Sequence, residues 1–255
     1  MDRPPSRGWR RLARAAVPLL AAALLFPASA FAEGGWDPNI SPLRDGNWTK
    51  SLNWSGFAQQ SSISNPLDGY VSSVKAEWVV PTLTCDPSAP EATASVWVGI
   101  DGFTTGTTVE QVGTQLSCGS DGVASYQPFY AMYPDPSVTF ALAVRPGDRV
   151  RGQVSYASGK FTLSLSNLTT GASYTTAQTN ALAPRRSGEY IVEARTLSGG
   201  ITPLANFGTV TFTNTAMTLS QKTGAGLVVD MVNSAGALLA DSSGVAYQVV
   251  WKQAS

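Results

Sequence analysis

The sequence predicts an all-β protein, built as a sandwich or a jelly-roll in one domain. From residue 51 onward, short segments rich in β-branched and aromatic residues alternate with Gly, Pro, Asn and Asp. No amphipathic helical pattern of useful length accompanies these segments. Without its N-terminal export segment the chain has roughly 220 residues, a common length for a single all-β domain.

Residues 1–32 have the pattern of a secretory signal peptide. Five arginines precede an apolar run at residues 15–26, and small residues follow it. The run is shorter than the ~20 residues of a membrane span. We expect cleavage after Ala30 or Ala32, and a secreted, extracellular protein that has no membrane partner after signal removal.

Residues 33–52 are rich in Gly, Pro and Asn without periodicity, which indicates an irregular N-terminal arm or a short pro-segment. The β domain is expected at residues 53–255. About a dozen segments in it read as strands, and a hairpin is expected at residues 160–177. The segments are 53–59, 69–81, 95–101, 109–114, 124–134, 138–144, 149–156, 160–168, 188–196, 207–214, 226–233 and 246–253.

The charge balance excludes some partners. The signal segment holds 5 of the 17 basic residues and one of the 17 acidic residues, which leaves 12 against 16. A mildly acidic protein without a Lys/Arg run is a poor ligand for nucleic acid or an anionic membrane. We expect a monomer.

The chain has two cysteines, Cys85 and Cys118, and an even pair in an exported protein predicts one disulfide. Such a bridge stabilises a fold by ~3 to 4 kcal/mol in the chain-entropy model. The rival interpretation is a reactive cysteine, which usually needs a histidine or another cationic neighbour to form its thiolate.

Histidine is absent from the whole sequence. Its absence excludes Ser-His-Asp and Cys-His catalysis and a His-ligated zinc site. A hydrolase of this composition has to draw its acid–base chemistry from carboxylates, lysine or tyrosine. We expect neither a metal nor a cofactor.

Residues 95–101 (SVWVGID) and 109–114 (VEQVGT) are the first candidate site segments. Alternation along a strand places Trp97 and Asp101 on the face opposite to three apolar core residues. In the second segment Gln111 shares a face with Val109 and Glu110 shares the other with Val112, so periodicity alone does not say which face is wet.

Two further segments offer side chains for a cleft. In GEYIVEAR, Glu189 and Glu193 share one strand face, and either could be a solvated charge or a catalytic carboxylate. In ASYQPFYAMYP, Phe129, Ala131 and Tyr133 share one face, whereas the other face carries Tyr126, Tyr130 and Met132. Because a two-layer sandwich has one core face per sheet, some of these rings are expected outside the core, where they could line a groove for a peptide or a sugar.

These motifs resemble the eqolisin family of glutamic peptidases. The motifs NWSGFA, VKAEWVVPT, SVWVGIDG, the Gln of VEQVG, FYAMYPD, GEYIVE and NFGTVTFTN occur in the family's order and at similar spacing, from Asn53 to about Trp251. The resemblance implies a β-sandwich of two roughly seven-stranded antiparallel sheets, like the concanavalin-type jelly-roll of lectins. It also implies an endopeptidase that cleaves protein or peptide substrates at acidic pH.

Carried over by motif, the catalytic dyad is Gln111 and Glu189, with Glu193 as the alternative carboxylate. Trp97 and Asp101 match family residues that line the cleft. The family's aromatic strand often carries a glutamate where this chain has Ala131, and tryptophans where it has Phe129 and Met132. A glutamate can activate a water and then protonate the leaving amine, while a glutamine amide stabilises the oxyanion.

Two other functions fit the same residues. A non-catalytic, lectin-like sandwich could bind carbohydrate or peptide through its aromatic groove. A glycosidase could use paired carboxylates, Glu189 with Glu193 or with Asp101.

Overall fold

The computed structural model describes residues 48–61, 70–103, 107–197, 200–220, 226–243 and 247–255. All of them belong to one compact unit, residues 31–255. The predicted signal peptide, its cleavage site and most of the predicted arm lie outside the described residues. No helix in the described ranges is long and apolar enough to cross a membrane.

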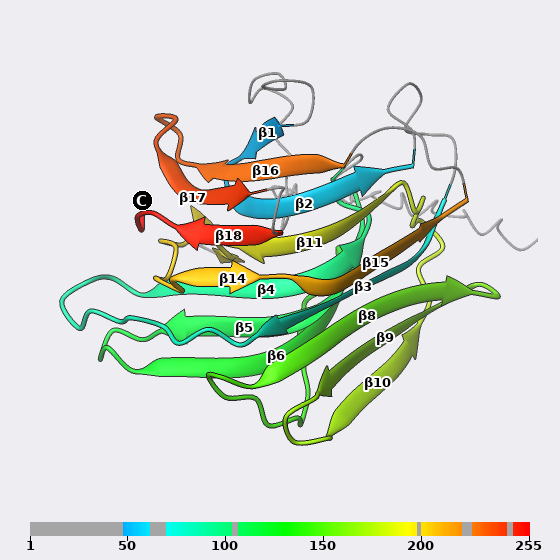
Figure 1. The fold of residues 1–255 in the computed structure, drawn as a ribbon, viewed down its shortest axis with the longest axis horizontal. Coiled ribbons are helices and arrows are strands. Elements are labelled where there is room, and N and C mark those ends of the chain that lie inside the picture. Colours follow the sequence, from blue (N-terminus) through cyan, green and yellow to red (C-terminus); the bar gives the residue numbers. More distant parts are fainter. Residues whose placement is uncertain (1–47, 62–69, 104–106, 198–199, 221–225, 244–246) are drawn as a thin grey trace, which may run out of the picture. The chain divides into compact units, whose positions relative to one another are not determined.

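The described residues form a β-sandwich of two unequal sheets (Figure 1). The larger sheet has eleven strands, all paired antiparallel except β1 (Trp48–Ser51), which pairs parallel with β16. The other ten are, in spatial order, β14 (Thr209–Thr211), β18 (Gln248–Trp251), β17 (Leu238–Ser243), β16 (Leu227–Val232), β2 (Trp54–Gln60), β11 (Ser187–Glu193), β4 (Ala92–Ile100), β5 (Val109–Cys118), β6 (Ala124–Tyr133) and β7 (Val138–Thr139).

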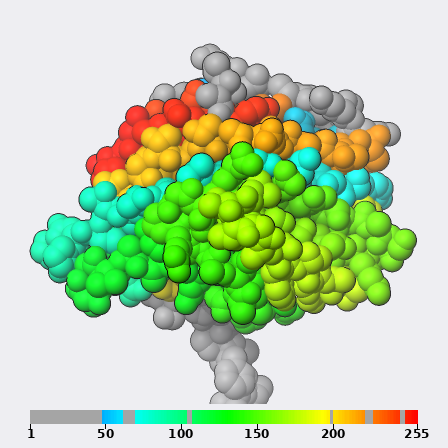
Figure 2. All heavy atoms as spheres, turned by 60° about the horizontal axis from the view of Figure 1, so that its bottom comes forward, coloured from blue at the N-terminus to red at the C-terminus, as the bar shows by residue number. Residues whose placement is uncertain are grey.

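The smaller sheet has five antiparallel strands, and a separate two-stranded pair completes the described strands. The five are, in order, β10 (Ser173–Gln178), β9 (Lys160–Asn167), β8 (Arg149–Ala157), β3 (Val71–Val79) and β15 (Thr213–Leu219); the pair is β12 (Thr196–Leu197) and β13 (Gly200–Ile201). In Figure 2 the strands β8 to β10, in green and yellow-green, form the near surface. The predicted antiparallel sandwich is confirmed, although its strands divide eleven and five instead of about seven and seven.

The main core lies between the two sheets. It joins inward-facing residues of the larger sheet, such as Val96 and Val98, to those of the smaller sheet, such as Val154 and Leu163. Alternation therefore sends the odd-numbered residues of β4 and β5 to the opposite face of the larger sheet. A second apolar cluster around Trp97 covers that face, called here the outer face.

Some of the local features predicted from sequence are present in the structure, and others differ. The predicted hairpin is present as β9 and β10, and Cys85 and Cys118 form the predicted disulfide. Residues 48–51, assigned to the arm from sequence, form β1 in the larger sheet instead. The segment 138–144 was predicted as a strand, but only its first two residues pair, with β6.

Candidate active site

Glu189 and Gln111 lie in one cross-strand row on the outer face. The register pairs Glu189 of β11 with Gly99 of β4, and Gly99 with Gln111 of β5. Residues paired across neighbouring strands point to the same face, so both side chains project outward. At about 4.8 Å per strand spacing, their Cα atoms are roughly 10 Å apart. The facing of Gln111, which periodicity left open, follows from this register.

Gly99 keeps the space between the two side chains open. A Cβ atom at this position would lie 2.7 Å from the Trp97 ring and 3.3 Å from Cβ of Gln111. Such distances would displace one of these side chains. The glycine of SVWVGID therefore serves as the gap between the carboxylate and the amide.

Glu189 is fully buried, and among the described residues no donor meets hydrogen-bond geometry at either carboxylate oxygen, although the Ser187 hydroxyl and the Phe103 backbone lie nearby. Burial raises its pKa well above the usual 4.5, and the nearby Asp101 and Glu110 raise it further. Ser187 and the backbone of Phe103 offset part of this rise in the pKa. Glu189 thus keeps its proton to a higher pH than an ordinary glutamate.

Gln111 is also buried, and its side-chain oxygen has no hydrogen-bond partner. Two uncommitted polar groups therefore face the same row of the sheet. Buried polar groups are nearly always paired, so an exception of this kind marks a candidate functional site.

Glu193, two positions beyond Ile191 on β11, differs from Glu189 in its partners. The Trp97 indole N–H donates to its Oε2 at 2.8 Å, and Asn53 Nδ2 donates to its Oε1 at 3.3 Å. Its carboxylate anchors the buried Trp97 ring, which packs edge-on against Trp54 with centroids 5.0 Å apart. Of the two glutamates that share this face, only Glu189 has both oxygens uncommitted.

Trp97 therefore lies in the site region, but as a buried ring below the row and not as an exposed wall. The register places Gly113 of β5 directly opposite it. A Cβ atom at Gly113 would approach Cβ of Trp97 to 2.6 Å. The two glycines, Gly99 and Gly113, thus make room for the indole.

Asp101 directly follows strand β4 with a positive φ of 69°, and its carboxylate accepts hydrogen bonds from backbone N–H groups. The backbone N–H groups of Arg185 and Arg186 donate to it at 2.7 and 2.6 Å, and the Thr108 hydroxyl lies at 3.5 Å. These two arginines directly precede β11. Asp101, expected from sequence in the cleft wall, thus holds the segment that leads to Glu189.

A second carboxyl group lies against Asp101. Glu110 of β5 points to the face opposite to Gln111, is fully buried, and accepts a hydrogen bond from Asn180 Nδ2 at 2.8 Å. Burial, reinforced by the charge of Asp101, raises the pKa of Glu110 to about 9. Burial also raises the pKa of Asp101 to about 6, although the two backbone N–H groups oppose that rise.

The side chains Phe129, Ala131 and Tyr133 of β6 lie on the outer face, as their parity predicted. Ala131 pairs with Gln111 in the same row, on the side away from Glu189. Phe129 and Ala131 are buried in the outer-face cluster, and Tyr133 packs against it half-buried. The opposite face carries the residues that pack on the main core, Tyr126, Tyr130 and Met132.

A small pocket adjoins Gln111, with a volume of about 10 Å³, which is room for roughly one water. Its lining is mostly polar: Ser95, Gln111, Gln115, Phe129, Ser137, Glu193, Arg195 and Thr196. Gln115 and Arg195 were not predicted from sequence as site residues. Gln115 could have been found from its parity with Gln111, whereas Arg195 lies beyond the end of β11, where alternation no longer applies.

Comparison with known proteins identifies the family. The model of the peptidase A4 family matches residues 52–251, most of the chain. The chain belongs to this family. The eqolisin resemblance inferred from the motifs is thereby confirmed.

Relatives of known structure agree with this assignment to the A4 family. Scytalido-glutamic peptidase, solved with a transition-state analogue inhibitor, superimposes with a TM-score of 0.64 at 25% identity, over 80% of this chain and 98% of that one. Aspergilloglutamic peptidase from Aspergillus niger gives a TM-score of 0.55 at 32% identity, over 63% and 99%. SCP-B, described as an eqolisin, shares the fold at 24% identity and a TM-score of 0.58, over 80% and 98%.

One curated relative is Aspergillopepsin-2 of Aspergillus niger, 32% identical over 192 residues. The match covers 66% of this chain, and the chain spans 64% of the length of that relative. Membership of the A4 family therefore rests on the family match over residues 52–251.

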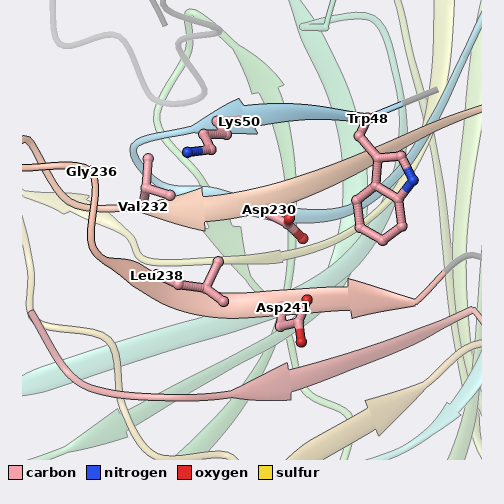
Figure 3. Close-up of a pocket in the computed structure, with 7 residues that line it drawn as sticks. All are labelled: Trp48, Lys50, Asp230, Val232, Gly236, Leu238 and Asp241. Carbon is pink, nitrogen blue, oxygen red and sulfur yellow. The ribbon is translucent and has the colours of Figure 1, made fainter. Parts of the chain in front are cut away.

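A larger pocket of about 440 Å³ lies several strands away along the same sheet, at β1, β16 and β17 (Figure 3). Three strands, β2, β11 and β4, separate β16 from the strand that carries Gln111. Figure 3 shows Trp48 and Lys50 on β1 and two aspartates, Asp230 and Asp241, on the neighbouring strands. Both aspartates already have partners, the backbone N–H of Ser242 and the ammonium of Lys252 respectively.

Proposed function

We propose that this protein is a secreted endopeptidase that hydrolyses peptide bonds with a Gln111/Glu189 dyad at mildly acidic pH. The observation that carries the proposal is the row Glu189–Gly99–Gln111, in which an uncommitted carboxyl and an uncommitted amide face the same space. Membership of the A4 family and similarity to a glutamic peptidase solved with a transition-state analogue support it.

The chemistry requires an ionised Glu189 at the start of the cycle. Its carboxylate takes a proton from a water that attacks the peptide carbonyl, and the resulting acid protonates the leaving amine. The Gln111 amide N–H donates to the developing oxyanion, a role worth ~3 to 4 kcal/mol where single donors have been removed. Because the pKa of Glu189 is raised, the ionised form is reached above the usual value of 4.5, and the acid limb of the rate profile follows it.

The geometry favours the peptidase over the two other functions considered from sequence. Glu193 and Asp101, the two candidate partners of Glu189 in a glycosidase, are each held by two donors at 3.3 Å or less. A binding module has no need to keep Glu189 and Gln111 buried without partners, because desolvated polar groups cost stability.

The secreted protein should be incubated with denatured protein from pH 2 to 8, with pepstatin present. Wild type is expected to release peptides, whereas Glu189→Gln and Gln111→Ala should lose ~10²-fold or more in kcat/KM. Glu91→Gln and Gln127→Ala, at exposed positions, are matched controls that retain activity. Absence of cleavage by wild type at every pH contradicts the function, and equal cleavage by the dyad variants contradicts the dyad.

The secretory route, the boundary at residue 53, the monomeric state and the absence of a nucleic-acid partner remain predictions from sequence. N-terminal sequencing of the secreted protein tests the first two, and its molar mass in solution tests the third. Peptide or protein substrates are proposed on the family assignment alone.

A further inference from the structure

The dyad chemistry does not use Glu110, although this residue is fully buried and directly precedes Gln111. Its Oε1 accepts from Asn180, but its Oε2 has no N–H or O–H donor among the described residues. The strand register pairs Glu110 with Ile100, the residue before Asp101, and the two carboxyl groups are close enough to share a hydrogen bond. Two buried carboxylates in contact cannot both carry a charge at low cost, so this contact needs a proton.

The partners of the two groups decide which one carries that proton. Asp101 already accepts two short backbone N–H bonds, from Arg185 and Arg186, which favour its charged form. Glu110 has a single neutral amide donor, Asn180. Glu110 is therefore the acid of the pair and Asp101 the acceptor.

We propose that Glu110 is a positioning residue of the peptidase, whose protonated carboxyl donates a hydrogen bond to Asp101 and so fixes Gln111 relative to Glu189. The linkage connects three segments that are distant in sequence. Glu110 sits beside Gln111 on β5, Asp101 holds the backbone that leads into β11, and Asn180 belongs to the chain that follows β10 of the other sheet. Deprotonation of Glu110 places two like charges in contact and opens this linkage.

The charges that surround the linkage support this pH dependence. Asp101, directly after β4, is the titratable group in contact with Glu110, and its charge disfavours the ionisation of Glu110. Glu189 of β11 projects from the other face of the sheet, and its own pKa is raised by the charges of Asp101 and Glu110. Among the described residues, no lysine or arginine forms an ion pair with Asp101 or Glu110. The guanidinium groups of Arg185 and Arg186 lie instead over the Tyr70 ring, and that of Arg185 also over Tyr156.

The role in catalysis rests on the proposed peptidase function, but the linkage itself can be tested without activity. Glu110→Gln keeps the geometry, because its oxygen can accept from Asn180 while its N–H donates to Asp101, and it removes the titration. The full secreted chain should be compared with Glu110→Gln, Glu110→Leu and the exposed control Glu91→Gln. The measurements are Tm from pH 4 to 9, and kcat and KM over the same range.

At pH 4 the Tm of Glu110→Gln should equal that of wild type. At pH 8 it should be higher by at least ~5 °C, because the wild type alone must keep an uncharged carboxyl there. Its kcat should stay within ~3-fold of wild type at acidic pH and persist to higher pH, with KM unchanged. Glu110→Leu, which cannot donate to Asp101, should lose ~10-fold or more in kcat.

Parallel Tm profiles of wild type and Glu110→Gln overturn the linkage, and a wild-type kcat in Glu110→Leu overturns its positioning role. If Glu110→Leu does not fold, the Tm and kcat profiles of Glu110→Gln decide alone. If no form of the protein cleaves peptides, the proposed function fails while the Tm profiles still test the proton-sharing pair.

Discussion

The two glutamates of β11 should respond to substitution in opposite ways. Glu193→Ala removes the acceptor of two buried donors, Trp97 Nε1 and Asn53 Nδ2, at 2.8 and 3.3 Å. Each donor left unpaired costs ~1–3 kcal/mol, so we expect Glu193→Ala to lower the free energy of unfolding by about 2–6 kcal/mol. For a domain of this size the corresponding drop in Tm is ~4–24 °C.

Glu189→Gln, in contrast, breaks no protein hydrogen bond, because neither carboxylate oxygen of Glu189 has a partner. We expect its free energy of unfolding at pH 4 to remain within about 1 kcal/mol of wild type while its kcat/KM falls ~10²-fold or more. Urea unfolding at pH 4 and peptide-release kinetics measure the two quantities on the same preparations.

A Glu193→Ala variant that unfolds like wild type yet has no activity would refute this contrast between the two glutamates, since Glu193 would then be the catalytic carboxylate. Glu193→Gln refines the test, because a Gln oxygen can still accept from the Trp97 indole. Its loss of stability should be the smaller of the two.

Three further predictions follow from the same geometry. Gly99→Ala should lower kcat/KM ~10- to 100-fold, because its Cβ would meet the Trp97 ring at 2.7 Å and Cβ of Gln111 at 3.3 Å and disturb the row that holds the amide. Glu189→Leu should be inactive but more stable than wild type above pH 4.5, by about 1.4 kcal/mol for each pH unit up to the raised pKa of Glu189. Replacing Cys85 and Cys118 by serine should cost ~3 to 4 kcal/mol of stability and leave activity at low temperature.

The sign of the Glu189→Leu effect follows from proton linkage. The folded protein holds the Glu189 proton more tightly than the unfolded chain, so unfolding releases a proton and wild-type stability falls as pH rises above 4.5. The leucine variant has no carboxyl proton to release at this position, so its stability does not fall with pH for this reason. Equal pH dependence of the two unfolding curves would mean that Glu189 titrates normally.

The Gly99→Ala variant and the double serine variant at Cys85 and Cys118 each have a matched control. Gly226→Ala, where the nearest atom to the added Cβ is a side-chain oxygen at 3.4 Å, should leave kcat/KM near wild type. Reduced wild type should unfold like the double serine variant. A Gly99→Ala variant with full activity contradicts the argument from the open row.

Strand alternation predicted the faces of the site residues correctly wherever the strand is regular. Val96 and Val98 face the main core and Trp97 faces outward, as SVWVGID indicated. Alternation does not extend to Asp101, which follows the strand at a positive φ and accepts hydrogen bonds from the backbone of the neighbouring segment. A single residue in the left-handed region breaks the period on which the prediction depends.

Features that depend on pairing between distant strands could not be predicted from strand alternation. Alternation left the face of Gln111 open and placed Glu189 and Glu193 on one face, so the choice of Gln111 and Glu189 came from the family resemblance. The register with Gly99 and the indole that reaches Glu193 add a physical reason for that choice. Strand β17 was missed because LLADSS has two apolar residues and then polar ones, and only its partners β16 and β18 make it a strand.

The buried carboxyl groups of this site differ in the number of hydrogen-bond donors that surround them. Glu193, with two donors, serves as a structural acceptor; Asp101, with two backbone donors, serves as the acceptor end of a linkage. Glu110, with one amide donor, retains a proton, and Glu189, with no partner meeting hydrogen-bond geometry, is the group whose protonation state is most open to change by a substrate or a water. An unpaired buried carboxyl lowers stability at neutral pH, so its place beside an unpaired amide supports the proposed dyad more than a role in folding.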